Sequence, residues 1–213
     1  MAVLPNDLAL LVFAATLCGA SPTMALDPRY PDWPCQQLKV PGISPVAFWN
    51  GPSLDSVYKE RLTDPKSAEL VARLVARRTP MEQARKLIEA FVVGSDAEKQ
   101  VSATALFAQL YSVLNSQRDE VMNGIERFSR KEKDMAAEIR AKTQEMQRME
   151  DGANADQAAI DQLATQLAWE TRIFEDRQRS LSYVCEVPVL IEKRLFDLGR
   201  LIEEAANFDA QPK

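Results

Sequence analysis

A four-and-three spacing of seam positions runs through the second half of this chain and constrains its fold more than any other feature. The first series comprises Phe107, Leu110, Leu114, Gln117, Val121, Ile125, Phe128, Glu132, Met135, Ile139, Lys142, Met146 and Met149. The second comprises Ile160, Leu163, Leu167, Glu170, Phe174, Arg177, Leu181, Val184, Pro188, Ile191, Leu195, Leu198 and Ile202. A 3.5-residue repeat held over this length is typical of two helices that supercoil around each other.

Only a short break, from Asp151 to Asp156, separates the two series. A connection of a few residues can join only antiparallel neighbours, so the sequence predicts one long helical hairpin. Aligning Met149 with Ile160 places the polar seam residues Glu132 and Arg177 opposite each other. This pairing of opposite charges supports the register, and we expect the pair to fix the alignment more than to add stability.

Two shorter helices are predicted before the hairpin. Asp64 and Thr79 are each followed by proline, which is favoured at the first helical position, and they are the predicted N-caps of helices over 65–78 and 80–93. Glu82 lies three residues after Thr79 and would complete a capping box. These helices can cover one end of the hairpin. The predicted fold class is therefore all-α, with a helical domain over 64–213 built on a four-helix base.

The tip half of the hairpin, about 129–176, has no further helix to cover it. With about 22 residues per leg at 1.5 Å each, it would project about 30 Å as a two-helix arm. The candidate partner-binding residues are Met135, Ile139, Met146, Met149, Trp169 and Phe174. Methionine packs adaptably, and charged residues interrupt the seam at Lys142 and Glu170, so the isolated pair is weakly specified. We expect the arm to bind a protein partner or a second copy; a simple solvated coiled coil is the alternative.

A proline-rich strap over 26–63 precedes the helices. Prolines at 28, 31, 34, 41, 45 and 52 favour extended, stiff backbone. Its aromatic residues need apolar surface to cover them, so we interpret Trp33, Phe48 and Trp49 as core contacts of the strap. The alternative is that these three side chains form a pocket for a small hydrophobic ligand.

Residues 1–25 are predicted to be a secretory signal peptide. An apolar run over 8–17 is followed by small residues and by the cleavage-site pattern Thr23-Met24-Ala25. The run is too short to span a bilayer, which favours cleavage over retention as an anchor. No integral span is then expected in the mature chain, which we expect to be periplasmic or secreted.

Removal of the signal would take Cys18 with it and leave Cys35 and Cys185. Two cysteines in an oxidising compartment favour a structural disulfide. Pro188 should bend the second long helix near Cys185, and we expect the strap to cross there. The alternative is a thiol-dependent redox or assembly factor that acts through Cys35 and Cys185. Against this alternative, the chain has no C-x-x-C motif.

The chain contains no histidine, which excludes Ser-His-Asp and Cys-His hydrolases and histidine-based metal sites. Its net charge of −5 makes it a poor candidate for binding nucleic acid. Acids near the tip turn lack the regular spacing of a calcium loop. We therefore expect a non-enzymatic interaction, scaffold or chaperone-like protein without cofactor or metal.

Overall fold

The computed structural model describes residues 27–55 and 65–208, and the regular structure in these ranges is helical, without strands. The elements are the 3-10 helix η1 (Pro45–Ala47) and the α-helices α2 (Pro65–Val75), α3 (Met81–Phe91), α4 (Asp96–Glu150), α5 (Gln157–Cys185) and α6 (Val187–Ala206). The predicted all-α fold class is confirmed. The predicted signal peptide over 1–25 and the predicted N-cap Asp64 lie outside the described residues.

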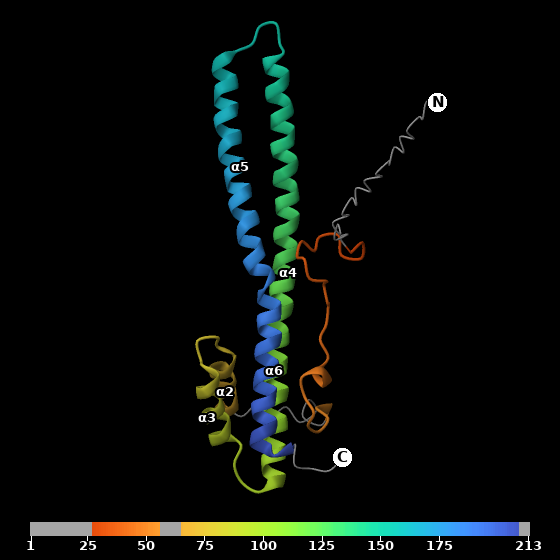
Figure 1. Cartoon of the computed structure of the whole chain (residues 1–213), viewed down its shortest axis with the longest axis vertical. Coiled ribbons are helices and arrows are strands. Elements are labelled where there is room, and N and C mark those ends of the chain that lie inside the picture. The colour runs from red at the N-terminus through yellow and green to blue at the C-terminus, as the bar shows by residue number, and fades with distance from the viewer. Residues whose placement is uncertain (1–26, 56–64, 209–213) are drawn as a thin grey trace, which may run out of the picture.

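The hairpin dominates the molecule, because α4 runs along its whole length and α5 and α6 return beside it (Figure 1). The first leg begins at a capping box, in which the side chain of Ser95 accepts from the backbone N–H of Glu98 and the Glu98 carboxylate accepts from the N–H of Ser95. Across the tip turn, the carboxylate of Asp156 accepts from two backbone N–H groups and caps α5.

The return leg is interrupted where the sequence predicts a bend. Helix α5 ends at Cys185, Glu186 caps both helices, and α6 begins at Val187 with Pro188 in its first turn. Proline has no N–H to continue the hydrogen-bond ladder of the preceding helix, so a break at this point is expected.

The predicted register is confirmed by an ion pair across the seam. Nη1 of Arg177 lies 3.3 Å from Oε1 of Glu132, which is buried. The predicted seam is wrong at Gln117, which is exposed, whereas its neighbour Arg118 is only 2% exposed. The reason is that the strap covers α4 from a second side here, so positions outside the two-helix seam also become buried.

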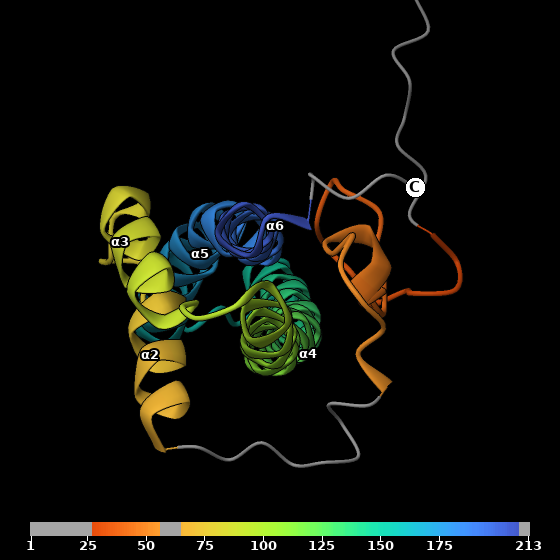
Figure 2. The same ribbon diagram turned by 90° about the horizontal axis from the view of Figure 1, so that it is seen from below.

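The base has three layers: α2 and α3, then α4 and α6, then the strap (Figure 2). Helix α2 packs mainly on α4, and α3 packs mainly on α6. Residues with no solvent exposure form the centre of this core: Leu74, Ile88, Leu106, Phe107, Leu110, Leu195, Leu198 and Ile202. Gly199 lets the strap approach closely, because a Cβ at this position would lie 2.5 Å from the carbonyl oxygen of Phe48.

The connection between α2 and α3 differs from the prediction. Helix α2 ends at Val75 rather than at 78, and α3 has Pro80 as its N-cap, without a side-chain cap. The hydroxyl of Thr79 donates instead to the carbonyl of Arg73 at the end of α2, over 2.7 Å. The predicted capping box of Thr79 and Glu82 is therefore wrong, because Pro80 adopts extended backbone and α3 starts one residue later.

Candidate functional site: the disulfide clasp and the arm

The strap is joined to the return leg by a disulfide between Cys35 and Cys185, with a Cα–Cα distance of 5.6 Å. This distance lies within the normal range for disulfides. The bond joins the strap to the last residue of α5, at the interruption of the return leg, where the strap is predicted to cross. We refer to Trp33, Cys35, Gln37 and Cys185 as the clasp.

Two polar contacts fix the clasp around the sulfur atoms. The indole N–H of Trp33 donates to the carbonyl of Gln37 over 2.7 Å. The side-chain amide of Gln37 donates to the carbonyl of Cys185 at the end of α5. A small apolar cluster surrounds these groups and includes Trp33, Cys35, Met122, Ile125, Leu181 and Cys185. The clasp therefore supplies a hydrogen-bond donor to the carbonyl of Cys185 at the end of α5 and buries the disulfide bond.

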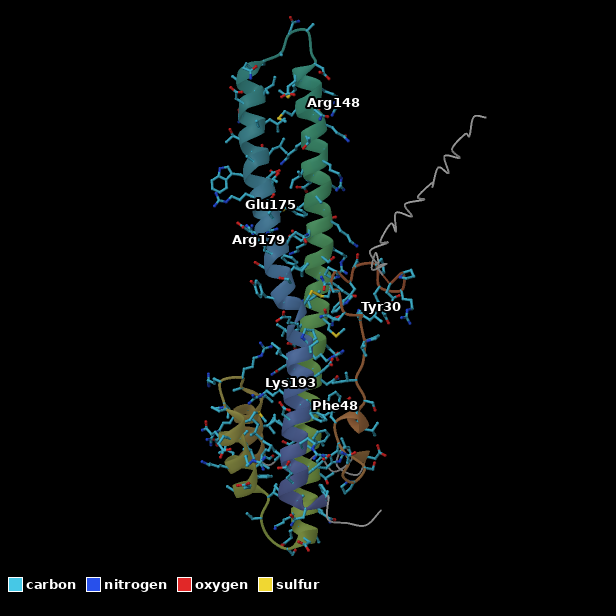
Figure 3. All side chains as sticks on the ribbon, in the orientation of Figure 1. Tyr30, Phe48, Arg148, Glu175, Arg179 and Lys193 are labelled. Atoms are coloured by element: carbon cyan, nitrogen blue, oxygen red, sulfur yellow. A yellow bond between two sulfur atoms is a disulfide. The ribbon has the colours of Figure 1, made fainter. Side chains whose placement is uncertain are left out.

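Ion pairs hold the N-terminal part of the strap against α4. The carboxylate of Asp32 lies 2.8 Å from Nζ of Lys133 and 3.1 Å from Nη1 of Arg130. Hydrogen bonds from Lys133 and, secondarily, from Arg130 hold the pKa of Asp32 below its ordinary value. Lys39 pairs with Glu126 over 2.5 Å, and its ammonium lies 4.7 Å from the centre of the Tyr30 ring. Figure 3 shows Tyr30 beside α4 near mid-hairpin and Phe48 at the base.

Arg118 connects three elements in the buried layer beneath the strap. Its Nε lies 2.5 Å from a carboxylate oxygen of Glu192 on α6, and its Nη2 donates to the carbonyl of Val40 over 2.6 Å. Two turns earlier on α4, the hydroxyl of Tyr111 donates to the carbonyl of Ile43 over 2.6 Å. Burial raises the pKa of Tyr111. Neither residue is marked by the sequence, because both bond to backbone carbonyls of the strap, which no side-chain pattern reveals.

The strap tryptophans are core contacts in the structure. Trp33 is 4% exposed and Trp49 is 6% exposed. The Trp49 ring stacks on Phe107 with centroids 4.4 Å apart, and its indole N–H donates to the carbonyl of Pro52. Nearby, Glu203 accepts from the backbone N–H of Asn50 over 2.6 Å. Rings packed and hydrogen-bonded in this way support the interpretation as core contacts over the ligand-pocket alternative.

A cleft of about 300 Å³ lies beside the disulfide. It is lined by Pro34, Cys35, Gln36, Gln37, Gln178, Leu181, Ser182, Cys185 and Glu186. This lining contains an acid and no base. A nearby cation is the usual means of lowering the pKa of a reactive thiol, and none of the described residues that line this cleft is a lysine or arginine. The environment of the bond therefore suits a structural disulfide better than a redox centre.

The candidate arm residues divide into two sets. Met135, Ile139, Met146, Met149 and Phe174 are half-buried along the seam between α4 and α5. Trp169 lies outside the seam and is 64% exposed. Buried apolar side chains are few along this stretch and include Ile160, which is 5% exposed, and Leu167, which is 7% exposed. The arm thus brings the seam residues together but leaves Trp169 in solvent.

Charged pairs occupy two levels of the arm seam. Lys142 pairs with Glu170, which also accepts a hydrogen bond from Gln166. Lys142 and Gln166, in that order, lower the pKa of Glu170. Within the described structure, Oε2 of Glu132 and Oε2 of Glu170 are buried and accept no hydrogen bond. Each of these carboxylates has one oxygen in an ion pair and one buried oxygen without a hydrogen bond. Such partly satisfied polar groups weaken the seam of an isolated pair of helices.

An apolar groove that the sequence did not indicate lies between α2, α3 and the first turns of α4. Its volume is about 440 Å³. It is lined by Ser67, Phe91, Ala97, Glu98, Val101, Ser102, Ala105, Leu106 and Gln109. These residues come from three different helices, and their spacing within a helix is the usual spacing of core positions. No local sequence pattern therefore marks the groove.

Across residues 27–55 and 65–208, no group of three or more potential metal ligands comes together. No helix in these ranges combines the length and apolarity needed to cross a bilayer. Neither a known protein-family model, nor a curated protein, nor a solved structure shows significant similarity to this chain.

Proposed function

We propose that this protein is an exported, non-enzymatic interaction, scaffold or chaperone-like protein, which presents its helical arm to a protein partner in the periplasm or outside the cell. The observation that carries the proposal is the contrast between a base whose core side chains, such as Phe107 and Leu195, have no solvent exposure and an arm whose seam residues are only half-buried. Half-buried methionine and phenylalanine side chains can repack against a helix that approaches from outside.

The location outside the cytoplasm is part of the same proposal. It rests on the signal-like pattern over 1–25 and on the disulfide between Cys35 and Cys185. Structural disulfides persist in oxidising compartments and are rare in the cytosol. Detection of residue 26 as the N-terminus of protein recovered from a periplasmic or secreted fraction would test this location directly.

A shortened arm tests the function. Deleting 136–149 together with 160–173 removes two heptads from each leg, keeps the tip turn and preserves the register defined by Glu132 and Arg177. The deletion shortens the arm by about 21 Å. We expect the variant to keep its disulfide and its helical base and to lose the partner that the full chain cross-links in its native envelope.

Controls separate loss of binding from loss of folding. Mass spectrometry of non-reduced peptides should still find Cys35 linked to Cys185 in the shortened variant, and its far-UV spectrum should stay helical. Substitution of Arg140, an exposed residue on the α4 side of the arm, by alanine should leave capture unchanged. Undiminished capture by a folded short-arm variant would contradict the proposal.

A thiol-dependent redox or assembly factor is the second candidate, favoured only by the cleft that borders both cysteines. In that reaction a client thiolate would attack one sulfur to form a mixed disulfide. A second client thiol would then release the protein with both cysteines as thiols and the client oxidised. Trapping of a client on Cys185→Ser through the free Cys35 would support this candidate, whereas an equal loss of thermal stability in Cys35→Ser and Cys185→Ser without trapping would support the structural bond.

A further inference from the structure

The outer face of α5 carries a stripe of exposed side chains that continues at four-and-three spacing. We refer to it as the outer stripe, formed by the half-buried Ala159 and the exposed residues Gln162, Gln166, Trp169, Ile173, Asp176, Ser180 and Tyr183. Its large side chains are exposed: Trp169 by 64%, Ile173 by 40% and Tyr183 by 74%. Trp169 lies two residues, or about 200°, from the seam residue Leu167, so the outer stripe faces away from α4.

The same face is already covered by a helix where it continues into the base. The spacing passes through Leu190 and Arg194 to Leu201, which is buried. Nε of Arg194 donates to the carbonyl of Leu74 over 2.8 Å, which brings this face against α2 and α3. In Figure 1, α2 and α3 lie beside α6 and end below α5. Continuity with this internal interface indicates that the element suited to the outer stripe is another helix.

We propose that the outer stripe binds the outer stripe of a second copy of this chain, antiparallel, around a two-fold axis at residue 171. This inference rests on the proposed function, because it names the partner of the arm. The spacing of the stripe is symmetric about residue 171, so every stripe position meets another stripe position. The pairs are 159 with 183, 162 with 180, 166 with 176, and 169 with 173. A two-fold interface requires this kind of self-complementary surface.

The chemistry of the paired positions is compatible at each level. Trp169 packs against the partner's Ile173, and by symmetry the contact occurs twice. The side-chain amide of Gln166 can donate to the partner's Asp176, and Gln162 can bond to the partner's Ser180. No two carboxylates meet along the stripe. A tryptophan beside an aliphatic residue at the centre of an interface is the usual composition of a binding hot spot.

The internal cover of α6 limits the register of the second copy. Cover by α2 and α3 begins at Arg194, so an incoming tip cannot extend that far along the stripe. With the axis at residue 171, Gln157 at the start of α5 reaches the level of the partner's Cys185 and stops short of the covered stretch. A shift of the axis towards the base by one heptad would bring the tip against α2 and α3.

One contact in this arrangement is unfavourable and supplies a direct test. Arg172 flanks the stripe next to the axis, so it lies beside the same residue of the second copy. Arg172 is exposed, and no ion pair holds it within the described part of the chain. Replacing this arginine removes a repulsion between like charges and should tighten the dimer.

The first experiment is sedimentation equilibrium of the full mature chain with its disulfide intact, over a wide range of concentrations. We expect a monomer–dimer equilibrium, with Kd raised at least about tenfold by Trp169→Glu. Arg140→Glu on the outer face of α4 is the matched control and should leave Kd unchanged. A wild-type chain that stays monomeric throughout would overturn the inference. In that case the proposed function could still hold without the dimer: it would be supported if the short-arm deletion variant failed to capture a different protein that the full chain captures.

The second experiment tests the axis. Arg172→Cys should form a covalent dimer in mildly oxidising buffer through a bond between the two introduced cysteines, and Arg172→Ala should lower Kd. Arg140→Cys, which faces away from the interface, is the control and should stay monomeric on non-reducing gels. Equal cross-linking at both positions, or a wild-type dimer insensitive to Trp169→Glu, would contradict the proposed interface.

Discussion

The base and the arm share one continuous helix, α4, yet they are built differently. In the base, α4 is covered by α2, by α6 and by the strap, and side chains such as Phe107 and Leu110 have no solvent exposure. In the arm, the same helix has only α5 beside it, and Met135, Ile139, Met146 and Met149 stay half-buried. Helical periodicity alone therefore does not set local stability: the number of covering elements does.

Truncating the base core should have the largest effect on global unfolding. Phe107→Ala removes a fully buried ring that stacks on Trp49, and we expect a loss of about 3–5 kcal/mol in the free energy of unfolding. Met146→Ala in the arm, where the side chain is half-buried, should cost less than about 1 kcal/mol. Urea denaturation monitored by circular dichroism measures both. Equal losses of unfolding free energy in the two variants would contradict the conclusion that the base is more stable than the arm.

Removing the clasp bond should have the next largest effect. The bond closes a loop with a sequence separation of 150, and its loss in Cys35→Ser/Cys185→Ser should lower the free energy of unfolding by about 2–4 kcal/mol. Hydrogen exchange should rise most around the clasp and the α5–α6 interruption, while the amides near the tip remain unchanged. Faster exchange confined to the tip would contradict a clasp that stabilises the junction.

Replacing a seam charge should strengthen the arm by a smaller amount. Glu132→Leu removes a buried carboxylate with an unsatisfied oxygen, whereas Arg177, which is 45% exposed, can return to solvent. We expect a gain of about 1 kcal/mol in the local opening free energy, measured by hydrogen exchange between 129 and 140. Glu138→Leu, at an exposed position on the same helix, is the control. Reduced protection in Glu132→Leu would show that the ion pair stabilises the arm.

Acidification should release the N-terminal part of the strap without unfolding the base. Because the pKa of Asp32 lies below its ordinary value, its contact with Lys133 and Arg130 is present above about pH 4 and is lost as pH falls through the lowered pKa. Proton exchange and side-chain NMR of the strap across this range would follow the change. Asp32→Asn should abolish the pH dependence. A transition that persists in Asp32→Asn would assign it to another carboxylate.

The sequence predicted the features that arise from repetition and from covalent chemistry. The heptad series predicted the hairpin and placed Glu132 opposite Arg177, and the pairing predicted for Cys35 and Cys185 is the bond that the structure contains. It also located the interruption of the return leg through Pro188. These features follow from local periodicity or from residue types with few alternatives.

The sequence did not reveal the features that depend on where the strap lies. Arg118 reads as a surface residue of α4 and becomes buried only because the strap and α6 close over it. Likewise, Thr79 has the sequence of an N-cap but bonds to the end of the preceding helix. In both cases a contact between separate segments overrides the local signal, and one sequence carries no record of that contact.

The position of the clasp also constrains the order in which this chain can fold. A ribosome makes Cys35 long before Cys185, so the early thiol has no native partner while both legs of the hairpin are synthesised. Oxidation can complete the native bond only after the return leg has emerged and settled against α4. A nascent chain stopped short of residue 185 would therefore keep Cys35 exposed to every other thiol in its surroundings.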